Sequence, residues 1–438
     1  MSYRGFQMRL PALILFAAVA FAQKAPEPAA AAALTEQEEL SKALGEAGNS
    51  GADITRALEY HLRKYPETAQ RPAIEKALAQ WAIEGNDRAR TILYGERVLK
   101  AEPDNELQLI DRVIRSLLDQ AELEQAKPLK DTSETAKKAL VYARRYESQI
   151  EAMRTRAAEG HMSPGQWTEQ VDRNLTRSLV LKARAFGLSG QTDDAIKTAT
   201  TAWTTMPASE AAHELARWLE KAGRREEAIE YYAAAFSIED SAATEAGRDA
   251  DRRRAGELYT AIHGSEKGLG DVFLAAYDRT RTLNRERVAR LKAGDPNFDA
   301  VEIADFTLPR SDGAKPLALA SLKGKTVVLD FWATWCGPCR AQHPLIENVK
   351  KNFKDGDVVF LAVDADDDHS LVAPFLKENH WDTDVYFDGG MGRTLKISSI
   401  PTTIVLDREG RVSSRMTGFI PELFEDMLKQ RIEETRTN

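Results

Sequence analysis

Cysteine is almost absent from this chain, whose 438 residues include only Cys336 and Cys339. Disulfide bonds therefore cannot hold the fold together, and this length suffices for two or three domains with hydrophobic cores of their own. Long basic runs are missing too, since 60 Lys and Arg stand against 68 Asp and Glu for a net charge of −8. Nucleic acid is not an expected partner, because phosphates bind to positive surfaces.

The start of the chain lacks a hydrophobic run long enough to cross a membrane. Leu10–Ala22 would span about 20 Å as a helix, at about 1.5 Å per residue, against ~30 Å of hydrocarbon. Arg4 and Arg9 precede this run, which ends in small residues where a signal peptidase cuts. Residues 1–22 are interpreted as a cleaved signal peptide, with an uncleaved anchor as the alternative, and residues 23–34 as an Ala/Pro-rich spacer. We expect an exported, periplasmic or otherwise extracytoplasmic protein with no stable membrane anchor after cleavage.

Glycine and proline are few between residues 35 and 293, where Ala, Leu, Glu, Lys and Arg dominate. This composition predicts helices throughout the region. Two segments align at an offset of 33 residues and place small residues and a glycine at matching positions. The matched pairs are Ala183 and Ala216, Gly190 and Gly223, Ala195 and Ala228, and Ala202 and Ala235. Small residues suit helices that cross closely, and glycine suits the turn between them.

This spacing resembles the tetratricopeptide repeat, whose period is about 34 residues. The resemblance implies an α-helical solenoid with a concave surface that binds a protein ligand. An irregular helical array stays open as an alternative, as do helices that only space or dimerise the neighbouring domain. Breaks are expected at His263–Gly264 and Gly268–Gly270, and a turn at Asp295–Asn297 ends the region.

After residue 300 the pattern changes to short β-type runs that alternate with helices. Three nearly continuous apolar runs predict strands buried on both faces: Thr326–Trp332, Val358–Val363 and Thr402–Leu406. The other expected elements are helices at 338–353, 370–379 and 421–434 and a strand at 411–417. This order predicts an α/β domain with a mixed sheet over residues 302–438.

Both cysteines lie between a predicted strand and a predicted helix, in the sequence Trp335-Cys336-Gly337-Pro338-Cys339. At the start of a helix, Cys336 faces unpaired backbone N–H groups and the positive end of the helix dipole, which lower the pKa of a thiol. Cys339, one turn later, is placed to attack a mixed disulfide formed at Cys336. The spacing therefore predicts a reversible two-electron switch.

Three other roles for the pair are open but less favoured. A zinc site requires two further ligands at a suitable spacing, which the histidines do not provide, so neither a metal nor another cofactor is expected. A structural disulfide would close a loop of four residues and constrain the unfolded chain little. A peroxide-reducing site would carry Thr three residues before the nucleophile, where this chain has Ala333.

The run from Asp330 to Cys339, DFWATWCGPC, resembles the active site of the thioredoxin superfamily. Pro344 matches that family's helix kink, and Ile400-Pro401-Thr402 matches its cis-proline loop. Segments 306–325 and 364–368 resemble the exported TlpA-like branch. The resemblance implies a thiol/disulfide oxidoreductase in which Cys336 attacks a substrate disulfide, Cys339 resolves the adduct and Asp330 moves the proton of Cys339. The residues expected to contact the substrate are Trp335, Gly337, Pro338, Ile400 and Pro401.

Asp330 interrupts an apolar strand, so burial should raise the pKa of its carboxyl toward the range useful for proton exchange. A buried Asp with purely structural hydrogen bonds is the alternative. Two positions depart from the related families: Val358–Val363 offers no lysine partner, and Gln342 stands where the TlpA-like branch commonly has glutamate. Proton transfer is therefore expected to rest on Asp330 alone. The acidic residues of 364–368 are interpreted as a solvated loop rather than a cation site.

Taken together, these features predict an exported oxidoreductase that reduces disulfides of protein substrates and is recharged by a separate electron donor. The Gly-Pro dipeptide matches thioredoxin, whose potential of about −270 mV favours the reducing direction. The helical region is expected to recruit a protein partner. The alternative is a non-catalytic helical scaffold or adaptor that carries a thioredoxin-like binding domain.

Overall fold

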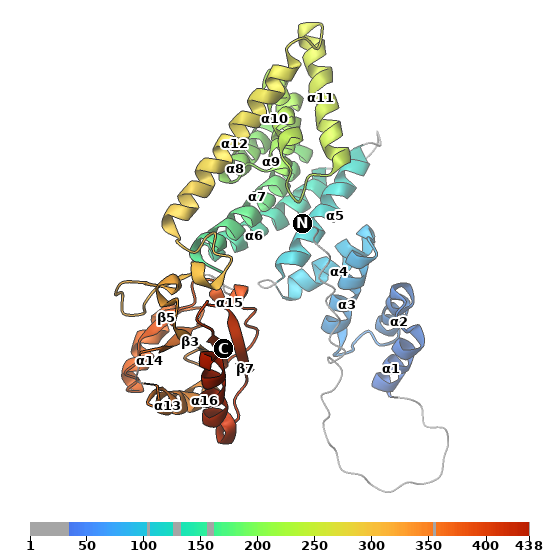
Figure 1. Ribbon diagram of the computed structural model, residues 1–438. Helices are drawn as coiled ribbons and strands as arrows, with labels where there is room; N and C mark the ends of the chain where they lie inside the picture. Colours follow the sequence, from blue (N-terminus) through green and yellow to red (C-terminus); the bar gives the residue numbers. More distant parts are fainter. Residues whose placement is uncertain (1–34, 103–105, 126–132, 156–161, 354–355, 438) are drawn as a thin grey trace, which may run out of the picture. The chain divides into compact units, whose positions relative to one another are not determined.

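The computed structural model describes residues 35–102, 106–125, 133–155, 162–353 and 356–437 (Figure 1). The predicted signal peptide and spacer lie outside these residues. The chain divides into two compact units, residues 1–74 and 75–438, each of which is described by itself. Within the described ranges, none of the helices combines the length and the apolar character needed to cross a membrane.

The first unit contains α1 (Glu36–Ala47) and α2 (Gly51–Lys64), and α3 (Arg71–Glu84) straddles the division. Thr35 and Glu38 form a capping box that satisfies backbone N–H groups at the start of α1. His61 of α2 reaches back to Glu36, with Nε2 3.1 Å from Oε1. The contact between His61 and Glu36 links the two short helices.

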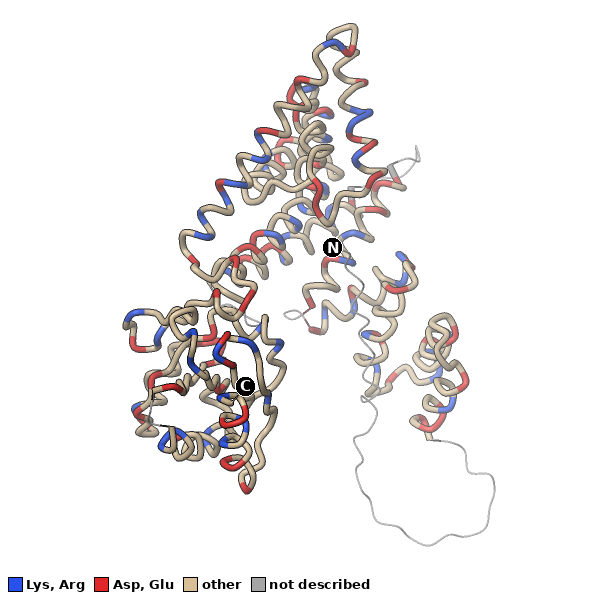
Figure 2. Tube along the Cα trace, viewed as in Figure 1, with Lys and Arg blue, Asp and Glu red and all other residues tan. Residues whose placement is uncertain are grey.

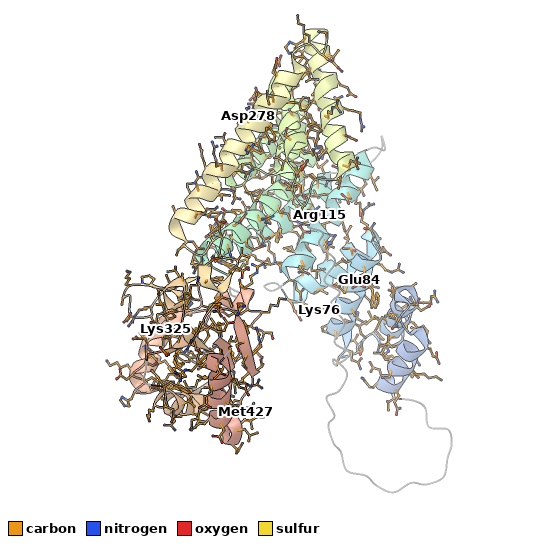
Figure 3. The ribbon with its side chains drawn as sticks, viewed as in Figure 1. Lys76, Glu84, Arg115, Asp278, Lys325 and Met427 are labelled. Carbon is orange, nitrogen blue, oxygen red and sulfur yellow. A yellow bond between two sulfur atoms is a disulfide. The ribbon has the colours of Figure 1, made fainter. Side chains whose placement is uncertain are left out.

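Helices continue through the second unit as far as residue 294. They are α4 (Arg88–Ala101), α5 (Leu107–Gln125), α6 (Ser133–Met153), α7 (Pro164–Leu188), α8 (Thr192–Thr205), α9 (Ser209–Lys221), α10 (Arg225–Ser237), α11 (Glu245–His263) and α12 (Leu269–Gly294). The predicted helical class is confirmed, and the gap between α11 and α12 falls at the predicted breaks. Charges of both signs are interspersed along these helices (Figure 2), and side chains fill the space between neighbours (Figure 3).

The small residues matched at the 33-residue offset are buried inside the helical array. The six alanines, at positions 183, 195, 202, 216, 228 and 235, have no exposed surface. Gly190 and Gly223 adopt φ values of 85° and 79° in the turns that follow α7 and α9, a conformation that favours glycine. Closely crossing helix pairs require small buried residues at the contact, as these alanines are, and tight turns, as these glycines provide. The tetratricopeptide repeat itself stays a prediction.

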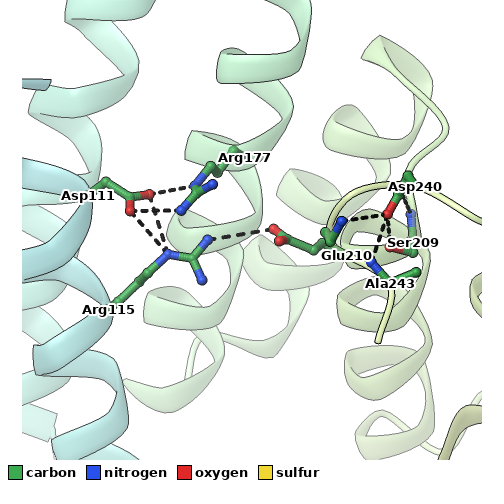
Figure 4. A network of polar contacts seen from close by, with 8 residues as sticks. Asp111, Arg115, Arg177, Ser209, Glu210, Asp240 and Ala243 are labelled. Carbon is green, nitrogen blue, oxygen red and sulfur yellow. Dashed lines mark hydrogen bonds and ion pairs between the residues drawn. The ribbon is translucent and has the colours of Figure 1, made fainter. Parts of the chain in front are cut away.

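An ion network joins α5, α7 and α9 (Figure 4). Arg177 of α7 donates to both oxygens of Asp111 in α5, at 2.7 and 2.9 Å. Arg115 donates to Asp111 at 3.2 Å and lies 3.8 Å from Glu210 of α9. Asp240, after α10, accepts hydrogen bonds from the backbone and hydroxyl of the first residue of α9, at 2.8 and 2.7 Å. The buried carboxylate of Asp111 is thus paired twice, which offsets the cost of its desolvation.

The C-terminal domain is built on a five-stranded mixed sheet. Its strands are β3 (Thr326–Trp332), β4 (Val358–Asp364), β5 (Val385–Phe387), β6 (Thr402–Leu406) and β7 (Val412–Thr417), with a separate pair β1 (Thr307–Leu308) and β2 (Leu317–Ala318). Its helices are α13 (Gly337–Lys350), α14 (Val372–Glu378), α15 (Met391–Thr394) and α16 (Pro421–Thr437). The strand order is β5-β4-β3-β6-β7, with β3 parallel to β4 and antiparallel to β6. The predicted α/β class with a mixed sheet is confirmed.

Side chains of β3 alternate between the two faces of this sheet. Leu329 joins a core that includes α15, while Val328 joins the core beneath α13 and α16. Trp332 packs with both cysteines. Because alternate residues of a strand share a face, Asp330 lies on the face of Val328 and Trp332, which α13 covers. The fold therefore places a carboxyl group beneath the helix that carries the cysteines.

Candidate active site

The two cysteines lie where β3 leads into α13. They form a disulfide bond, with Cα atoms 5.3 Å apart. Cys336 is the N-cap of α13, and its Sγ accepts a hydrogen bond from the backbone N–H of Cys339 at 3.2 Å. The predicted position at the positive end of a helix is confirmed. Only 3% of Cys336 and 2% of Cys339 is exposed, so this oxidised pair is shielded from bulk solvent.

The two tryptophans beside the pair differ in their surroundings. Trp332 is buried and packs on Trp381 and Phe375, with ring centroids 4.9 and 5.4 Å apart. Trp335 is 68% exposed, and Gly337 and Pro338 on the other side of Cys336 are also exposed. Trp332 therefore belongs to the core, and Trp335 is available for contact with a binding partner.

The loop before β6 lies against the cysteine core. The Ile400–Pro401 peptide bond is cis, as the family resemblance implied. Ile400 is half-buried and packs against the cluster that contains both cysteines. The carbonyl of Pro401 accepts a hydrogen bond from the backbone of Gly418 at 2.9 Å, which fixes the loop to the end of β7. The fold thus brings two sequence-predicted site residues, Cys336 and Ile400, together from distant parts of the chain.

Asp330 is 8% exposed and makes a small hydrogen-bonded network. Burial raises the pKa of its carboxyl to about 7, against the opposing effect of hydrogen bonds from Thr403 and Gln342. Both bonds reach Oδ1: Gln342 Nε2 donates at 2.8 Å, and Thr403 Oγ1 donates at 3.2 Å. The predicted direction of the pKa shift is confirmed. The sequence does not indicate these partners of Asp330, although Gln342 stands out in it as a departure from the family.

The burial of Asp364 and Asp366 contradicts the prediction of a solvated acidic loop. Asp366 is buried and accepts hydrogen bonds from the backbone and hydroxyl of Thr334, at 2.7 and 3.0 Å, which fixes the segment just before Trp335. Asp364 ends β4 with no exposed surface, and neither carboxylate oxygen has a hydrogen-bond partner among the described residues. Burial and the neighbouring Asp366 raise the pKa of Asp364 to about 9. The prediction is wrong for these two residues because β4 continues to Asp364 and carries it into the interior.

The chemistry available at this site is that of two thiols and one carboxyl. A sulfur at the N-terminus of a helix is stabilised as a thiolate, and a carboxyl that titrates near neutrality can accept or supply a proton. In the part of the chain that the structure describes, no group of three or more His, Cys, Asp and Glu side chains is arranged to hold a metal ion. The two thiols and the neighbouring carboxyl are the groups that thiol–disulfide exchange uses.

Comparison with known proteins gives matches to oxidoreductases. The family model described as Redoxin matches residues 293–429. A thiol-disulfide oxidoreductase ResA of Bacillus cereus is 32% identical over 119 residues, which cover 27% of this chain and 68% of that protein. The ResA protein of Bacillus thuringiensis subsp. konkukian is 31% identical over 132 residues, covering 30% of this chain and 76% of that protein.

Among the other matches are a relative and a solved structure named DsbE. The thiol:disulfide interchange protein DsbE of Pseudomonas fluorescens is 31% identical over 121 residues, which cover 27% of this chain and 66% of that protein. The crystal structure of a putative DsbE from Chlorobium tepidum is 31% identical and matches 31% of this chain and 97% of that chain, with a TM-score of 0.28.

Proposed function

This chain belongs to the TlpA-like thiol–disulfide oxidoreductases of the thioredoxin superfamily, and on that premise we propose that it reduces disulfide bonds of proteins outside the cytoplasm. The observation that supports this proposal best is the position of Cys336. Its sulfur caps α13, is bonded to Cys339 and lies above the face of β3 that carries Asp330. These are the parts that a dithiol reductant requires.

The proposed reaction begins with the reduced pair. The thiolate of Cys336 attacks one sulfur of a substrate disulfide, forms a mixed disulfide and releases the other substrate sulfur as a thiolate. Asp330 then takes the proton of Cys339, and the Cys339 thiolate attacks Cys336. The bond between Cys336 and the substrate breaks, and the second substrate sulfur leaves as a thiolate. Two electrons pass to the substrate, and the pair ends as the disulfide that the structure contains.

The substrate is proposed to bind along the exposed rim beside Cys336. Trp335, Gly337 and Pro338 are exposed there, and Ile400 and Pro401 lie in the loop that packs on the cysteine core. An extended polypeptide can form backbone hydrogen bonds with such a loop through Ile400, because the proline nitrogen has no hydrogen to donate.

Two further parts of the proposal concern the compartment in which the protein works and the electron donor that reduces its disulfide again. The pattern of Arg4, Arg9 and Leu10–Ala22 supports export. An oxidising compartment would leave the pair as a disulfide, so a separate dithiol protein must supply two electrons for each cycle. The Gly337-Pro338 dipeptide supports a potential near that of thioredoxin, about −270 mV, and a potential near −120 mV would reverse the assigned direction.

The helical array is proposed to recruit a protein partner. Residues of α5, α7, α9, α10 and α11, together with the loop before α11, line a hollow of about 460 Å³, which carries both guanidinium and carboxylate groups. Arg115, Arg184, His213 and Asp251 are among the residues that line it. A hollow with charges of both signs suits a polar protein segment better than an apolar one.

Insulin reduction tests the proposed function. The full chain, with dithiothreitol as the electron source, should speed the precipitation of the insulin B chain. Cys336→Ser should abolish this acceleration, and Cys339→Ser should trap substrates as stable mixed disulfides at Cys336. No turnover by the wild-type chain would favour the alternative of a non-catalytic scaffold or adaptor.

A further inference from the structure

The hydrogen bonds around Asp330 form a closed triangle on one oxygen. The amide nitrogen of Gln342 has two hydrogens: one points to Oδ1 of Asp330 and the other to the hydroxyl of Thr403, at 2.8 and 3.1 Å. The single hydrogen of that hydroxyl points in turn to Oδ1, at 3.2 Å. Every donor of these two side chains is used, and two of the three bonds end on the same atom.

This arrangement distinguishes the two oxygens of the carboxyl. A carboxylate oxygen offers two lone pairs, and both lone pairs of Oδ1 are occupied by donors. No hydrogen bond among the described residues reaches Oδ2. A proton arriving at Asp330 can therefore settle on Oδ2 without breaking either existing bond, whereas a proton on Oδ1 would displace one of them.

The placement of Gln342 links this triangle to the reacting sulfurs. Gln342 lies one turn after Cys339 on α13, so the two side chains share the helix face that covers β3. Thr403 stands directly opposite Asp330 in the pairing of β3 with β6. Two other titratable groups lie toward the face of β3 that carries Asp330: Cys336, the N-cap of α13, and Asp364, the last residue of β4. The residues that α16 buries against the sheet are apolar apart from Thr435.

We propose that Gln342 and Thr403 are positioning residues, which hold Oδ1 of Asp330 and reserve Oδ2 for the proton of Cys339. The inference rests on the proposed function and adds to it the two partners and the oxygen that acts. In the resolving step the S–H bond of Cys339 breaks and its proton goes to Oδ2. The electron pair left on the sulfur forms the bond to Cys336, while the bond between Cys336 and the substrate sulfur breaks and that sulfur leaves as a thiolate. An amide at position 342 suits this task because it donates to the carboxylate, whereas a second carboxylate would repel it.

The test follows the mixed disulfide in time. The reduced full-length chain is mixed with oxidised glutathione across a range of pH, quenched with acid and analysed by mass spectrometry. Formation of the glutathione adduct reports the attack by Cys336, and its decay reports the resolving step at Cys339. In the wild type, the decay rate should rise with pH through a midpoint near neutrality, which reports Asp330.

Thr403→Val keeps the shape of the side chain but removes its donor, and Gln342→Leu removes both donors of the amide. Since each lost bond favoured the ionised carboxyl, the midpoint of decay should move upward by about one pH unit, with the midpoint of adduct formation unchanged. Thr403→Ser restores the donor and should restore the wild-type midpoint. Gln342→Glu should also raise the midpoint, because it places a like charge beside Asp330.

The outcomes separate this inference from the function on which it rests. If the wild type forms no adduct with glutathione, the proposed function fails. If the wild type forms and resolves the adduct while both donor-deleting variants keep its midpoint and lose only thermal stability, Gln342 and Thr403 are structural and the inference is wrong. If Asp330→Asn leaves the decay profile unchanged, Asp330 does not handle the proton and the inference falls with it.

Discussion

The carboxyl of Asp330 makes the stability of the protein depend on pH. Its pKa is about 7 in the folded chain, against an ordinary value of 3.8. Between these two values the folded chain binds more protons than the unfolded chain, so the free energy of unfolding falls as the pH rises. Asp330→Asn keeps an acceptor at Oδ1 and removes the titration. We expect it to match the wild type near pH 4 and to be more stable by roughly 4 kcal/mol at pH 8.

Urea unfolding of the disulfide-bonded protein between pH 4 and pH 8 measures this difference. Asp367→Asn serves as the matched control, because Asp367 is exposed on the neighbouring loop. The control should follow the wild-type curve at every pH. Curves for Asp330→Asn and wild type that stay parallel over this range would contradict a carboxyl that titrates near neutrality.

Single residues were predictable from the sequence where their chemistry is local. The two cysteines, the exposed Trp335 and the burial of Asp330 follow from a motif and an apolar strand. The contact between Thr403 and Asp330 does not, because it depends on the register of β3 against β6, which the sequence leaves open. The burial of Asp364 could not be predicted either, since a run of acidic residues normally indicates a solvent-exposed loop.

At the scale of elements, the crossing of α7 and α9 depends on one glycine. A Cβ built on Gly187 would lie 2.2 Å from the indole ring of Trp218, which is fully buried. Neither the helix backbone nor the packed ring can move away without losing packing contacts. Gly187→Ala should therefore destabilise the helical region by about 3 kcal/mol.

Chemical unfolding followed by far-UV circular dichroism checks this prediction. Gly270→Ala in α12 is the control, since a Cβ there would have no neighbour within 4 Å. That variant should be neutral or slightly more stable, because alanine favours helix over glycine. Equal stability of the two variants would mean that α7 and α9 are not packed as described.

The elements that the sequence predicted well are those with long apolar patterns. β3 and β6 have the predicted bounds, and α16 extends the predicted closing helix by three residues, from Glu434 to Thr437. The short strand β5, Val385–Phe387, and the β1–β2 pair were missed. Runs of two or three residues carry no periodicity, and they become strands only because a neighbouring strand offers hydrogen bonds.

At the scale of the whole molecule, recruitment and chemistry should be separable. If the hollow of the helical array binds protein substrates, Arg115→Ala should lower kcat/KM for a protein disulfide several-fold and leave the reduction of oxidised glutathione unchanged. Arg115 suits this test because Asp111 keeps its two hydrogen bonds from Arg177 when Arg115 is removed.

Lys197→Ala provides the matched control, since Lys197 is an exposed cation of α8 that does not line the hollow. It should behave as wild type toward both substrates. An Arg115→Ala variant that reduces protein and small disulfides equally well would contradict recruitment through this hollow.

The division into a helical array followed by an α/β domain was visible in the sequence, because composition and periodicity change together near residue 300. The residues that line the hollow come from five helices and a loop that are spread along the chain, so no local pattern indicates them. No local pattern indicates that Cys336 and Ile400 lie close together either; only the family resemblance suggests it.

The central claim is that the sulfur at the start of α13 is a reactive thiolate near neutral pH once the pair is reduced. Alkylation of the reduced chain by iodoacetamide at a series of pH values, with modified residues identified by mass spectrometry, tests it directly. We predict that Cys336 reacts first, with a midpoint at least about one unit below the ~8.5 of an ordinary thiol, and that Cys339 lags behind it. Two thiols that stay unreactive until pH 9 would contradict this account.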